Sequence, residues 1–310
     1  MSAARRLRGN NLNQGKRVHP IALEPTLGRV EIFRAPVQYH PMNTPIPPSL
    51  CPDDHVALAL RLADAARTVT RSYFRQPVTV FDKADASPVT VADREAEAAM
   101  RELIERTAPD HGIYGEEYGA VRTDAEWVWV LDPVDGTKAF ITGKPSFGTL
   151  IALLHKGVPV LGIIDQPILD ERWLGVSGRP STLNGRPIRV RPCPDLSLAA
   201  LYATAPEMFT GTDATAWEAL RSSVKLPRYG ADCYAYGLLA AGYVDLVVEA
   251  SLQPYDYLPL VAIIEGAGGL LTDWRGGRLG LRSDGRVIAA GDKAAHAATM
   301  AVLAKAGGGH

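Results

Sequence analysis

The chain has 310 residues, a net charge of −1, 46% hydrophobic residues and 22% charged residues, which is the composition of a globular protein with ample core. This near-neutral balance gives no reason to expect nucleic-acid binding, and no apolar run reaches the roughly 18 residues of a membrane helix. Cys51, Cys193 and Cys233 form no CxxC pair, so we expect a reduced, cytoplasmic protein without a zinc site.

The first 50 residues differ in composition from the rest of the chain. They hold seven of the 23 prolines and seven lysines or arginines against two glutamates, and they show no clear periodicity. We therefore predict a poorly ordered extension over residues 1–50. An organelle targeting peptide is an alternative, whereas the lack of a following apolar segment argues against a secretory signal.

Two helices are expected next. Apolar residues recur at helical spacing between Pro52 and Phe74. The sequence Thr90-Val91-Ala92-Asp93 has the pattern of a capping box and would begin a second helix over residues 94–106. Asp93 can therefore be explained as a helix cap alone. The two adjacent glutamates in the segment Ile113–Gly119 can likewise be explained as a solvated turn.

An apolar strand then runs into two carboxylates. Residues 127–131, WVWVL, are strand formers, and the strand is predicted to stop at the segment 132–137, DPVDGT. A turn would explain the Asp-Gly pair in isolation. Two carboxylates at the end of a buried strand, however, are costly without a cation, and oxygens at this spacing suit a hard divalent ion such as Mg²⁺.

The remainder of the chain alternates strands with helices, and Asn184-Gly185 marks a turn between them. Strands are predicted over residues 149–154, 158–164 and 244–250, and helices over 232–243 and from 255 to about 267. This order predicts an α/β protein of mixed α+β character, with a mixed sheet layered by helices. We expect two halves: residues 51–185, which would carry most of the metal ligands, and residues 186–310, which would complete the site.

Five carboxylates occupy the ends of predicted elements. They are Asp93, Glu116, Asp132, Asp135 and Asp256. Each has a simple explanation alone, but about five like charges at short range could not all stay ionised without cations. Two or three Mg²⁺ ions would balance them, and clustered oxygen ligands of this kind form the two-metal sites of phosphoryl-transfer enzymes. Spacing along the sequence does not by itself show that these positions converge.

At this point the chain resembles the inositol monophosphatase-like family of Mg²⁺-dependent, lithium-sensitive phosphatases. The resemblance rests on DPVDGT after its apolar strand, on the upstream GEE, on T-x-A-D before a helix, and on an aromatic-Asp pair that opens a helix ending in EGAGG. It covers about residues 53–304. It implies the layered α-β-α-β-α sugar-phosphatase fold, a homodimer, and hydrolysis of a phosphate monoester by metal-activated water without a phosphoenzyme.

The resemblance also implies a set of metal ligands. Glu116, Asp132 and the backbone carbonyl of Val134 would hold one ion. Asp132, Asp135 and Asp256 would hold a second ion. A third, looser ion would use Glu116 and mainly water.

Catalytic and phosphate-binding roles follow from the same resemblance. Thr137 would orient the attacking water with the help of Asp93. The family's helix begins just after DGT, so the amides of Gly136 and Thr137 would receive phosphate oxygens, as the N-termini of helices do.

Within the family, the chain looks most like the histidinol-phosphatase branch. The likeness lies in the stretches that begin RYGADCYAYG and GTKAFITGKP, and inositol monophosphatases usually have a small uncharged residue in place of Asp232. Histidinol phosphate carries a cationic amine and an imidazole, so its site should present extra carboxylate, for which Asp232 and Glu249 are candidates. Asp232 could instead cap its helix, and Glu249 also aligns with a glutamate that touches inositol in relatives. Arg186 is a further candidate contact, although a surface arginine after a turn explains it equally well.

Three other functions remain open from the sequence. They are an inositol-phosphate or broad sugar-phosphate phosphatase, a bisphosphonucleotide phosphatase, and a catalytically silent relative that binds metal. In every case the expected partner is a small molecule rather than a nucleic acid or a membrane.

Overall fold

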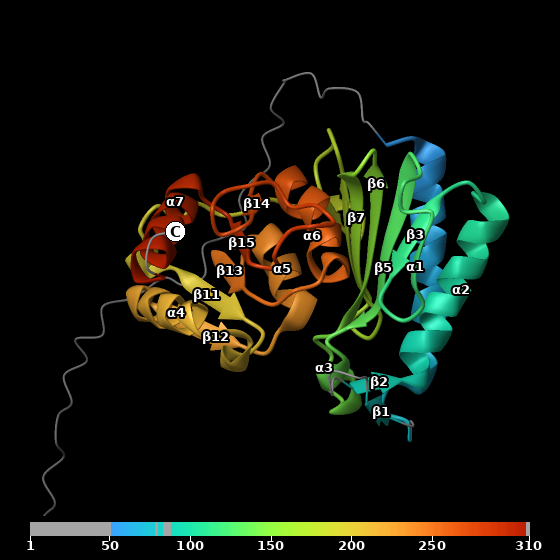
Figure 1. Ribbon diagram of the computed structural model, residues 1–310, viewed down its shortest axis with the longest axis horizontal. Helices are drawn as coiled ribbons and strands as arrows, with labels where there is room; N and C mark the ends of the chain where they lie inside the picture. The colour runs from blue at the N-terminus through green and yellow to red at the C-terminus, as the bar shows by residue number, and fades with distance from the viewer. Residues whose placement is uncertain (1–50, 78–79, 83–87, 308–310) are drawn as a thin grey trace, which may run out of the picture. The chain divides into compact units, whose positions relative to one another are not determined.

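The described residues of the computed structural model, which are 51–77, 80–82 and 88–307, fold into alternating layers of helix and sheet (Figure 1). All of them belong to one compact unit. The extension predicted over residues 1–50 lies outside the described residues. The boundary predicted between residues 185 and 186 falls in a hairpin, in which Arg186 pairs with Leu183.

The larger sheet has eight strands in the order β10-β9-β8-β7-β6-β5-β3-β4. All neighbouring strands are antiparallel except β3 and β5, which are parallel. Its strands are β3 (Gly112–Gly115), β4 (Gly119–Val121), β5 (Trp127–Asp135), β6 (Gly148–His155), β7 (Val158–Gln166), β8 (Glu171–Val176), β9 (Thr182–Leu183) and β10 (Arg186–Pro187). The strands predicted over residues 149–154 and 158–164 are confirmed as β6 and β7.

The second sheet has five strands in the order β12-β11-β13-β15-β14, and β1 and β2 form a separate two-stranded antiparallel sheet. These strands are β1 (Val80–Asp82), β2 (Pro88–Thr90), β11 (Ala200–Ala203), β12 (Leu226–Tyr229), β13 (Leu246–Glu249), β14 (Leu270–Thr272) and β15 (Val287–Ala290). The strand predicted over residues 244–250 is confirmed as the shorter β13.

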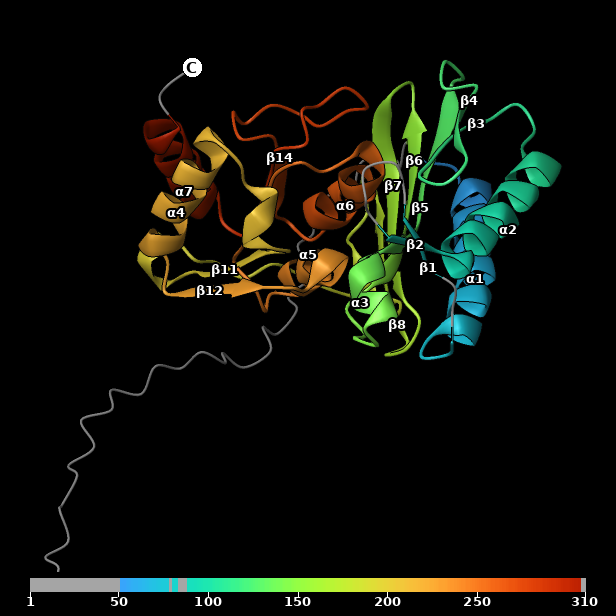
Figure 2. The same cartoon turned by 60° about the horizontal axis from the view of Figure 1, so that its bottom comes forward.

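Helices cover both sheets and fill the space between them (Figures 1 and 2). The helices are α1 (Asp53–Tyr73), α2 (Val91–Thr107), α3 (Thr137–Ile141), α4 (Thr212–Ser223), α5 (Asp232–Ala240), α6 (Pro254–Gly266) and α7 (Lys293–Ala306). Helices α1 and α2 pack on one face of the larger sheet, α5 and α6 lie between the sheets, and α4 and α7 pack on the smaller sheet. The predicted α-β-α-β-α layering is therefore confirmed, while α4 and α7 were not predicted.

Alternation along β5 decides which way its carboxylates point. Trp129 and Leu131 pack with α1 and α2, whereas Val128 and Val130 pack with α5 and α6. Because successive side chains of a strand point to opposite faces, Asp132 shares the face of Val128 and Val130. The strand therefore directs this carboxylate toward the central helices.

The prediction that the strand stops at Asp132 is wrong. Strand β5 continues to Asp135, with a register shift against β6 between Asp132 and Asp135. Pro133 fits there because a proline, which has no N–H to donate, is tolerated in a strand at an irregularity of this kind. The irregularity keeps both aspartates on one ordered strand.

Two glycines let α6 lie directly on the larger sheet. A Cβ atom on Gly162 would come 1.8 Å from the carbonyl oxygen of Pro259, and one on Gly175 would come 2.3 Å from the carbonyl carbon of Ala262. These contacts are with helix backbone, which cannot move aside as a flexible side chain can. The two glycines therefore fix the distance between α6 and strands β7 and β8.

None of the helices within residues 51–77 and 88–307 is long and apolar enough to cross a membrane.

We expect Gly162→Ala to lower the free energy of unfolding by about 2 kcal/mol or more, because the new methyl group would push α6 off the sheet. Chemical denaturation measures this change. Gly280→Ala is the matched control, since a Cβ atom there meets nothing within 4 Å. Equal stability of the two variants would contradict the close packing.

Candidate functional site

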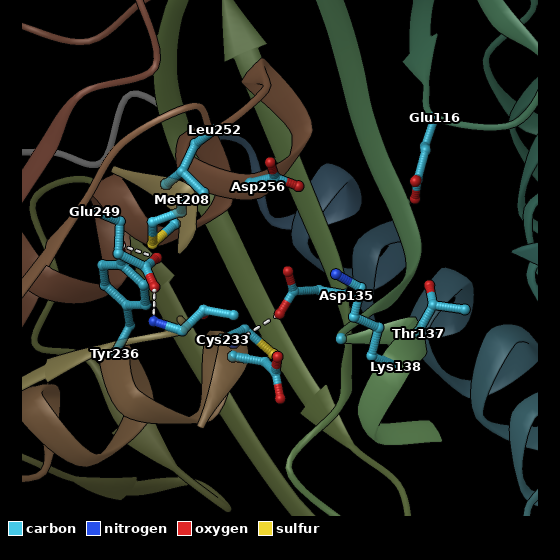
Figure 3. A pocket seen from close by; sticks show the side chains of 13 residues that line it. Glu116, Asp135, Thr137, Lys138, Met208, Cys233, Tyr236, Glu249, Leu252 and Asp256 are labelled. Carbon is cyan, nitrogen blue, oxygen red and sulfur yellow. Dashed lines mark hydrogen bonds between the residues drawn. The ribbon is translucent and has the colours of Figure 1, made fainter. Parts of the chain in front are cut away.

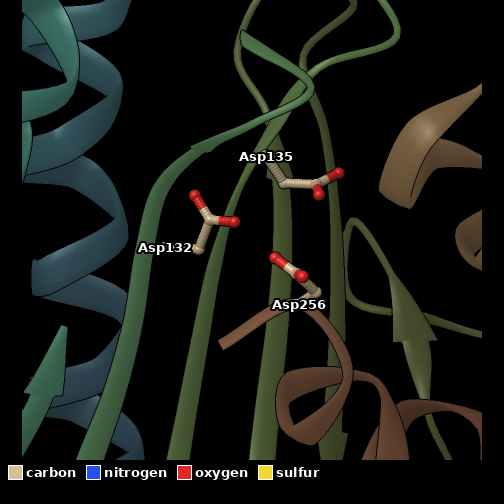
Figure 4. A group of neighbouring side chains, drawn as sticks. All are labelled: Asp132, Asp135 and Asp256. Atoms are coloured by element: carbon tan, nitrogen blue, oxygen red, sulfur yellow. The ribbon is translucent and has the colours of Figure 1, made fainter. Parts of the chain in front are cut away.

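Three aspartates converge where β5 meets the start of α6 (Figure 4). Asp132 and Asp135 come from β5 and Asp256 from the first turn of α6, and one carboxylate oxygen of each lies within 4.8 Å of the others. The backbone N–H of Cys233 donates to Oδ2 of Asp135 at 2.6 Å, and that of Gln253 donates to Oδ2 of Asp256 at 2.7 Å. The structure thus brings together three of the predicted metal ligands, one of which, Asp256, lies more than 100 positions after the other two in sequence.

Burial raises the pKa of each of these aspartates. Desolvation is the largest cause in all three, and it raises the pKa of Asp256 to about 7. Neighbouring carboxylates add to it: Glu116 raises the pKa of Asp132, and Asp232 raises that of Asp135. A divalent cation bound among these oxygen atoms would stabilise the ionised form of the three carboxylates.

A pocket opens in front of the cluster (Figure 3). Glu116, which follows β3, extends into this pocket from the side opposite the central helices. Its charge and a side-chain hydrogen bond are among the causes that raise the pKa of Asp132, so the two carboxylates interact. The lining residues are Glu116, Asp135, Gly136, Thr137, Lys138, Thr204, Met208, Asp232, Cys233, Tyr236, Glu249, Leu252 and Asp256.

Asp93 is both a helix cap and a neighbour of the pocket. Its Oδ2 accepts from the backbone N–H of Thr90 at 2.9 Å and from the Thr90 hydroxyl at 2.5 Å, which completes the predicted capping box. Its Oδ1 lies 3.2 Å from the hydroxyl oxygen of Thr137, which also lies 3.1 Å from the carbonyl oxygen of Val134. Asp93 can therefore cap helix α2 through Oδ2 and contact Thr137 through Oδ1 at the same time.

Gly136 stands at the start of α3 in a left-handed conformation, with φ of 85°. A Cβ atom at this position would come 2.8 Å from Cγ of Asp232. Glycine is thus required twice, by the backbone angle and by the close approach of the Asp232 carboxyl group.

Asp232 and Glu249 both line the pocket. Asp232 follows the N-cap of α5, which is Ala231, and its Oδ2 accepts from the hydroxyl of Ser146 at 2.8 Å. Glu249 is 3% exposed and accepts from the N–H of Thr204 at 2.6 Å and from the hydroxyl of Tyr236 at 2.8 Å. Glu249 therefore has both oxygens engaged within the protein, whereas Asp232 accepts from Ser146 through one oxygen and its carboxyl group faces the loop of Gly136.

Arg186 is placed elsewhere. It is exposed on β10, the last strand of the larger sheet, and it does not line the pocket. The preceding turn explains the local sequence, because the side chain of Asn184 accepts from the N–H of Arg172 and donates to the carbonyl of Asp170. A substrate contact made by Arg186 within this pocket is not supported.

Sequence analysis missed several residues of the pocket wall. These are Lys138, Thr204, Met208, Cys233, Tyr236 and Leu252. Lys138 could have been found, since it directly follows the DPVDGT motif. Met208 and Leu252 carry no local signal, because only the packing of the smaller sheet brings them to the pocket.

Comparison with known proteins identifies the family. Residues 52–307 match the model of the inositol monophosphatase family. The chain belongs to this family. This confirms the resemblance and the fold, and it makes the chain a phosphatase of the inositol monophosphatase family.

Several relatives of the family are named or solved. The chain is 53% identical over 253 residues to bifunctional phosphatase IMPL2, chloroplastic, of Arabidopsis thaliana, covering 79% of this chain and 73% of that one. It is 36% identical over 234 residues to a histidinol-phosphatase of Chlorobaculum parvum, covering 75% and 90%. A solved inositol monophosphatase from Zymomonas mobilis is 49% identical with a TM-score of 0.75, covering 81% and 98%.

In EDTA, the free energy of unfolding should fall as the pH rises from about 4 to about 7. Burial raises the pKa of Asp256 from its ordinary value of 3.8 to about 7 in the folded state, so the folded state keeps a proton that the unfolded state loses. This stabilising contribution is complete when the pH is below the unfolded pKa of 3.8, and it is lost as the pH rises through the folded pKa of about 7. Urea unfolding at pH 5 and pH 8, with EDTA and with Mg²⁺, measures it.

The variant Asp135→Asn tests, in the same experiment, how much the repulsion among the clustered carboxylates lowers the free energy of unfolding. At pH 8 in EDTA it should be more stable than the wild type by about 1 to 3 kcal/mol, because one of several like charges is removed. Asp124→Asn, at an exposed position, is the control and should change nothing. A wild type that is equally stable at both pH values, with no response to Mg²⁺, would refute the electrostatic account.

Proposed function

We propose that this protein is a Mg²⁺-dependent histidinol-phosphate phosphatase, which converts L-histidinol phosphate and water to L-histidinol and phosphate in histidine biosynthesis. The observation that carries the proposal is the position of Asp232. Its mostly buried carboxyl group lines the pocket next to the loop of Gly136 and is not one of the three clustered aspartates, although its charge acts on Asp135. A carboxylate at this place could pair with the cationic amine of the substrate.

The donor set fits Mg²⁺. Hard divalent cations prefer oxygen ligands, and the cluster offers carboxylates from Asp132, Asp135 and Asp256, with Glu116 beside them. We propose that Glu116, Asp132 and the carbonyl of Val134 hold one ion and that the three aspartates hold another, with a third ion held loosely by Glu116. Bound Mg²⁺ would activate a water molecule and stabilise negative charge on the phosphate.

The residues beside the cluster would orient the reactants. Oδ1 of Asp93 can accept the hydroxyl proton of Thr137, which leaves the lone pairs of that hydroxyl free to accept from a water molecule in the pocket. The backbone amides of Gly136 and Thr137, at the start of α3, would donate to phosphate oxygens. A phosphate held between these amides and the cluster would face the water that Thr137 orients.

The opposite wall of the pocket suits the rest of histidinol phosphate. Met208 and Leu252 lie next to each other there and offer apolar surface for an imidazole ring (Figure 3). Glu249, beside Met208, already accepts two hydrogen bonds from the protein, so its position is fixed. The names of the relatives from Chlorobaculum parvum and Mycobacterium tuberculosis, both histidinol-phosphatase, support the same substrate.

Hydrolysis of inositol-1-phosphate or of a range of sugar phosphates is the second candidate function. The relative from Zymomonas mobilis, solved as an inositol monophosphatase, is 49% identical. Glu249 lines the pocket and would suit a polyol hydroxyl as well as an amine.

Phosphate release in Mg²⁺ from L-histidinol phosphate, inositol-1-phosphate, fructose-1,6-bisphosphate and adenosine 3′,5′-bisphosphate separates these functions. We expect kcat/KM to favour histidinol phosphate by about 100-fold or more, which is about 2.7 kcal/mol of differential transition-state binding. Equal or greater activity on inositol-1-phosphate would reject the proposed substrate while keeping the phosphatase.

Asp232→Asn tests the residue that carries the proposal. Asparagine tolerates the left-handed backbone of this position, where φ is 48°, and it can still accept from Ser146. We expect kcat/KM for histidinol phosphate to fall by about 100-fold, since a buried charge pair is lost, and that for inositol-1-phosphate to change by less than about threefold. An equal loss on both substrates would show that Asp232 serves the metal site instead.

We also propose that the protein acts as a homodimer, as the resemblance implies, and that it works in the cytoplasm, as its lack of a CxxC pair suggests. Light scattering on the eluting peak of a sizing column tests the dimer. A mass near that of the 33.3 kDa chain at micromolar concentration would reject it.

A further inference from the structure

Helix α2 carries a second buried carboxylate one turn after Asp93. Glu97 is 0% exposed and does not line the pocket. The backbone N–H of Glu117 donates to its Oε2 at 2.7 Å, and the N–H of Tyr118 donates to its Oε1 at 3.1 Å. Glu97 therefore binds the backbone immediately after Glu116, and none of the roles described above uses it.

The charge of Glu97 is countered on the same helix. Nε of Arg101 donates to Oε1 of Glu97 at 2.7 Å, and the Arg101 guanidinium also donates to the carbonyl of Gly119. A Cβ atom on Gly115 would come 2.1 Å from that same Oε1. The segment 115–119 thus wraps closely around a single carboxylate, and glycine at its first position makes room for that carboxylate.

These contacts hold Glu116 from both sides. The backbone N–H of Glu116 itself donates to the carbonyl of Leu131 at 3.2 Å, which continues the pairing of β3 with β5. On the C-terminal side of Glu116, the N–H groups of Glu117 and Tyr118 donate to Glu97. With its backbone fixed on both sides, the Cα–Cβ bond of Glu116 has a fixed direction, and Figure 3 shows the side chain extending into the pocket.

We propose that Glu97 is a positioning residue for the metal site: by binding the backbone after Glu116 it fixes the direction of that ligand and so sets the affinity of the site for a divalent cation. The inference rests on the magnesium site of the proposed function. Only a carboxylate can serve here, because two backbone N–H groups and a guanidinium all donate to it. A glutamine would offer one acceptor oxygen and turn an NH₂ group toward a donor.

Magnesium titration of wild type, Glu97→Gln and Glu102→Gln tests the proposal. Glu102 is on the same helix, 76% exposed at its side chain, and makes only a 3.5 Å ion pair with Arg106, so its variant is the matched control. Calorimetry should show Mg²⁺ binding weakened by about tenfold or more in Glu97→Gln and unchanged in Glu102→Gln. The Mg²⁺ concentration for half-maximal activity should rise by the same factor, while kcat at saturating Mg²⁺ stays near that of the wild type.

The outcomes separate this inference from the proposed function. If the folded wild type binds no Mg²⁺, the magnesium site itself is rejected. If wild type and folded Glu97→Gln bind it equally well, only the role of Glu97 is rejected. A fall in kcat at saturating Mg²⁺, with unchanged metal affinity, would also overturn the proposal, since it would point to a role other than positioning a ligand.

Hydrogen exchange on the unaltered protein tests the same idea if Glu97→Gln does not fold. In EDTA, the amides of Glu117 and Tyr118 should already exchange slowly, because Glu97 binds them without the metal. Fast exchange of both amides in EDTA, with protection arising only when Mg²⁺ is added, would show that the metal orders the segment and would overturn the proposal.

Discussion

The burial of three like-charged carboxylates at the junction of β5 and α6 is the constraint on which the rest of the structure depends. Each of Asp132, Asp135 and Asp256 is costly to ionise there, and desolvation is the main reason. A fold that served only stability would avoid such a cluster. Its presence requires close packing that holds the three side chains together, and a bound divalent cation would offset the repulsion among them.

That packing comes from the apolar parts of the same elements. The alternation of β5 turns Val128, Val130 and Asp132 toward the central helices, while glycines on β7 and β8 let the backbone of α6 touch the sheet. The apolar contacts stabilise the fold, and by fixing the positions of β5 and α6 they also fix the positions of the polar residues at the ends of these elements. The site is therefore placed by the hydrophobic core rather than by attraction among its own residues, which repel one another.

Helix α2 connects the two sides of the site. Asp93 and Glu97 lie four residues apart, so they project from the same face of the helix. The first reaches Thr137 at the start of α3, and the second reaches the backbone after Glu116. One helix thus sets the relative positions of the loop that carries Glu116 and of the Thr137 hydroxyl.

Local patterns in the sequence determined the elements and the chemistry of the motif. Helical spacing predicted α1, the capping box predicted the start of α2, and the family motif predicted Asp132 and Asp135 as metal ligands, which the structure places together with Asp256. These features depend on neighbours within a few residues, where periods of 3.6 and 2 apply. The extension of β5 past Pro133 was missed because a strand's partner, here β6, decides whether an irregularity is tolerated.

Only the tertiary structure decided which residues meet. Glu97 reads as an ordinary solvated glutamate in a charged helix, yet packing against the loop after β3 buries it completely. Asp232 and Arg186 were both candidate substrate contacts in the sequence, and the order of strands placed the first in the pocket and the second at the far edge of the sheet. The physical reason is that contacts between residues some 20 to 160 positions apart arise from how whole layers pack, which no local spacing encodes.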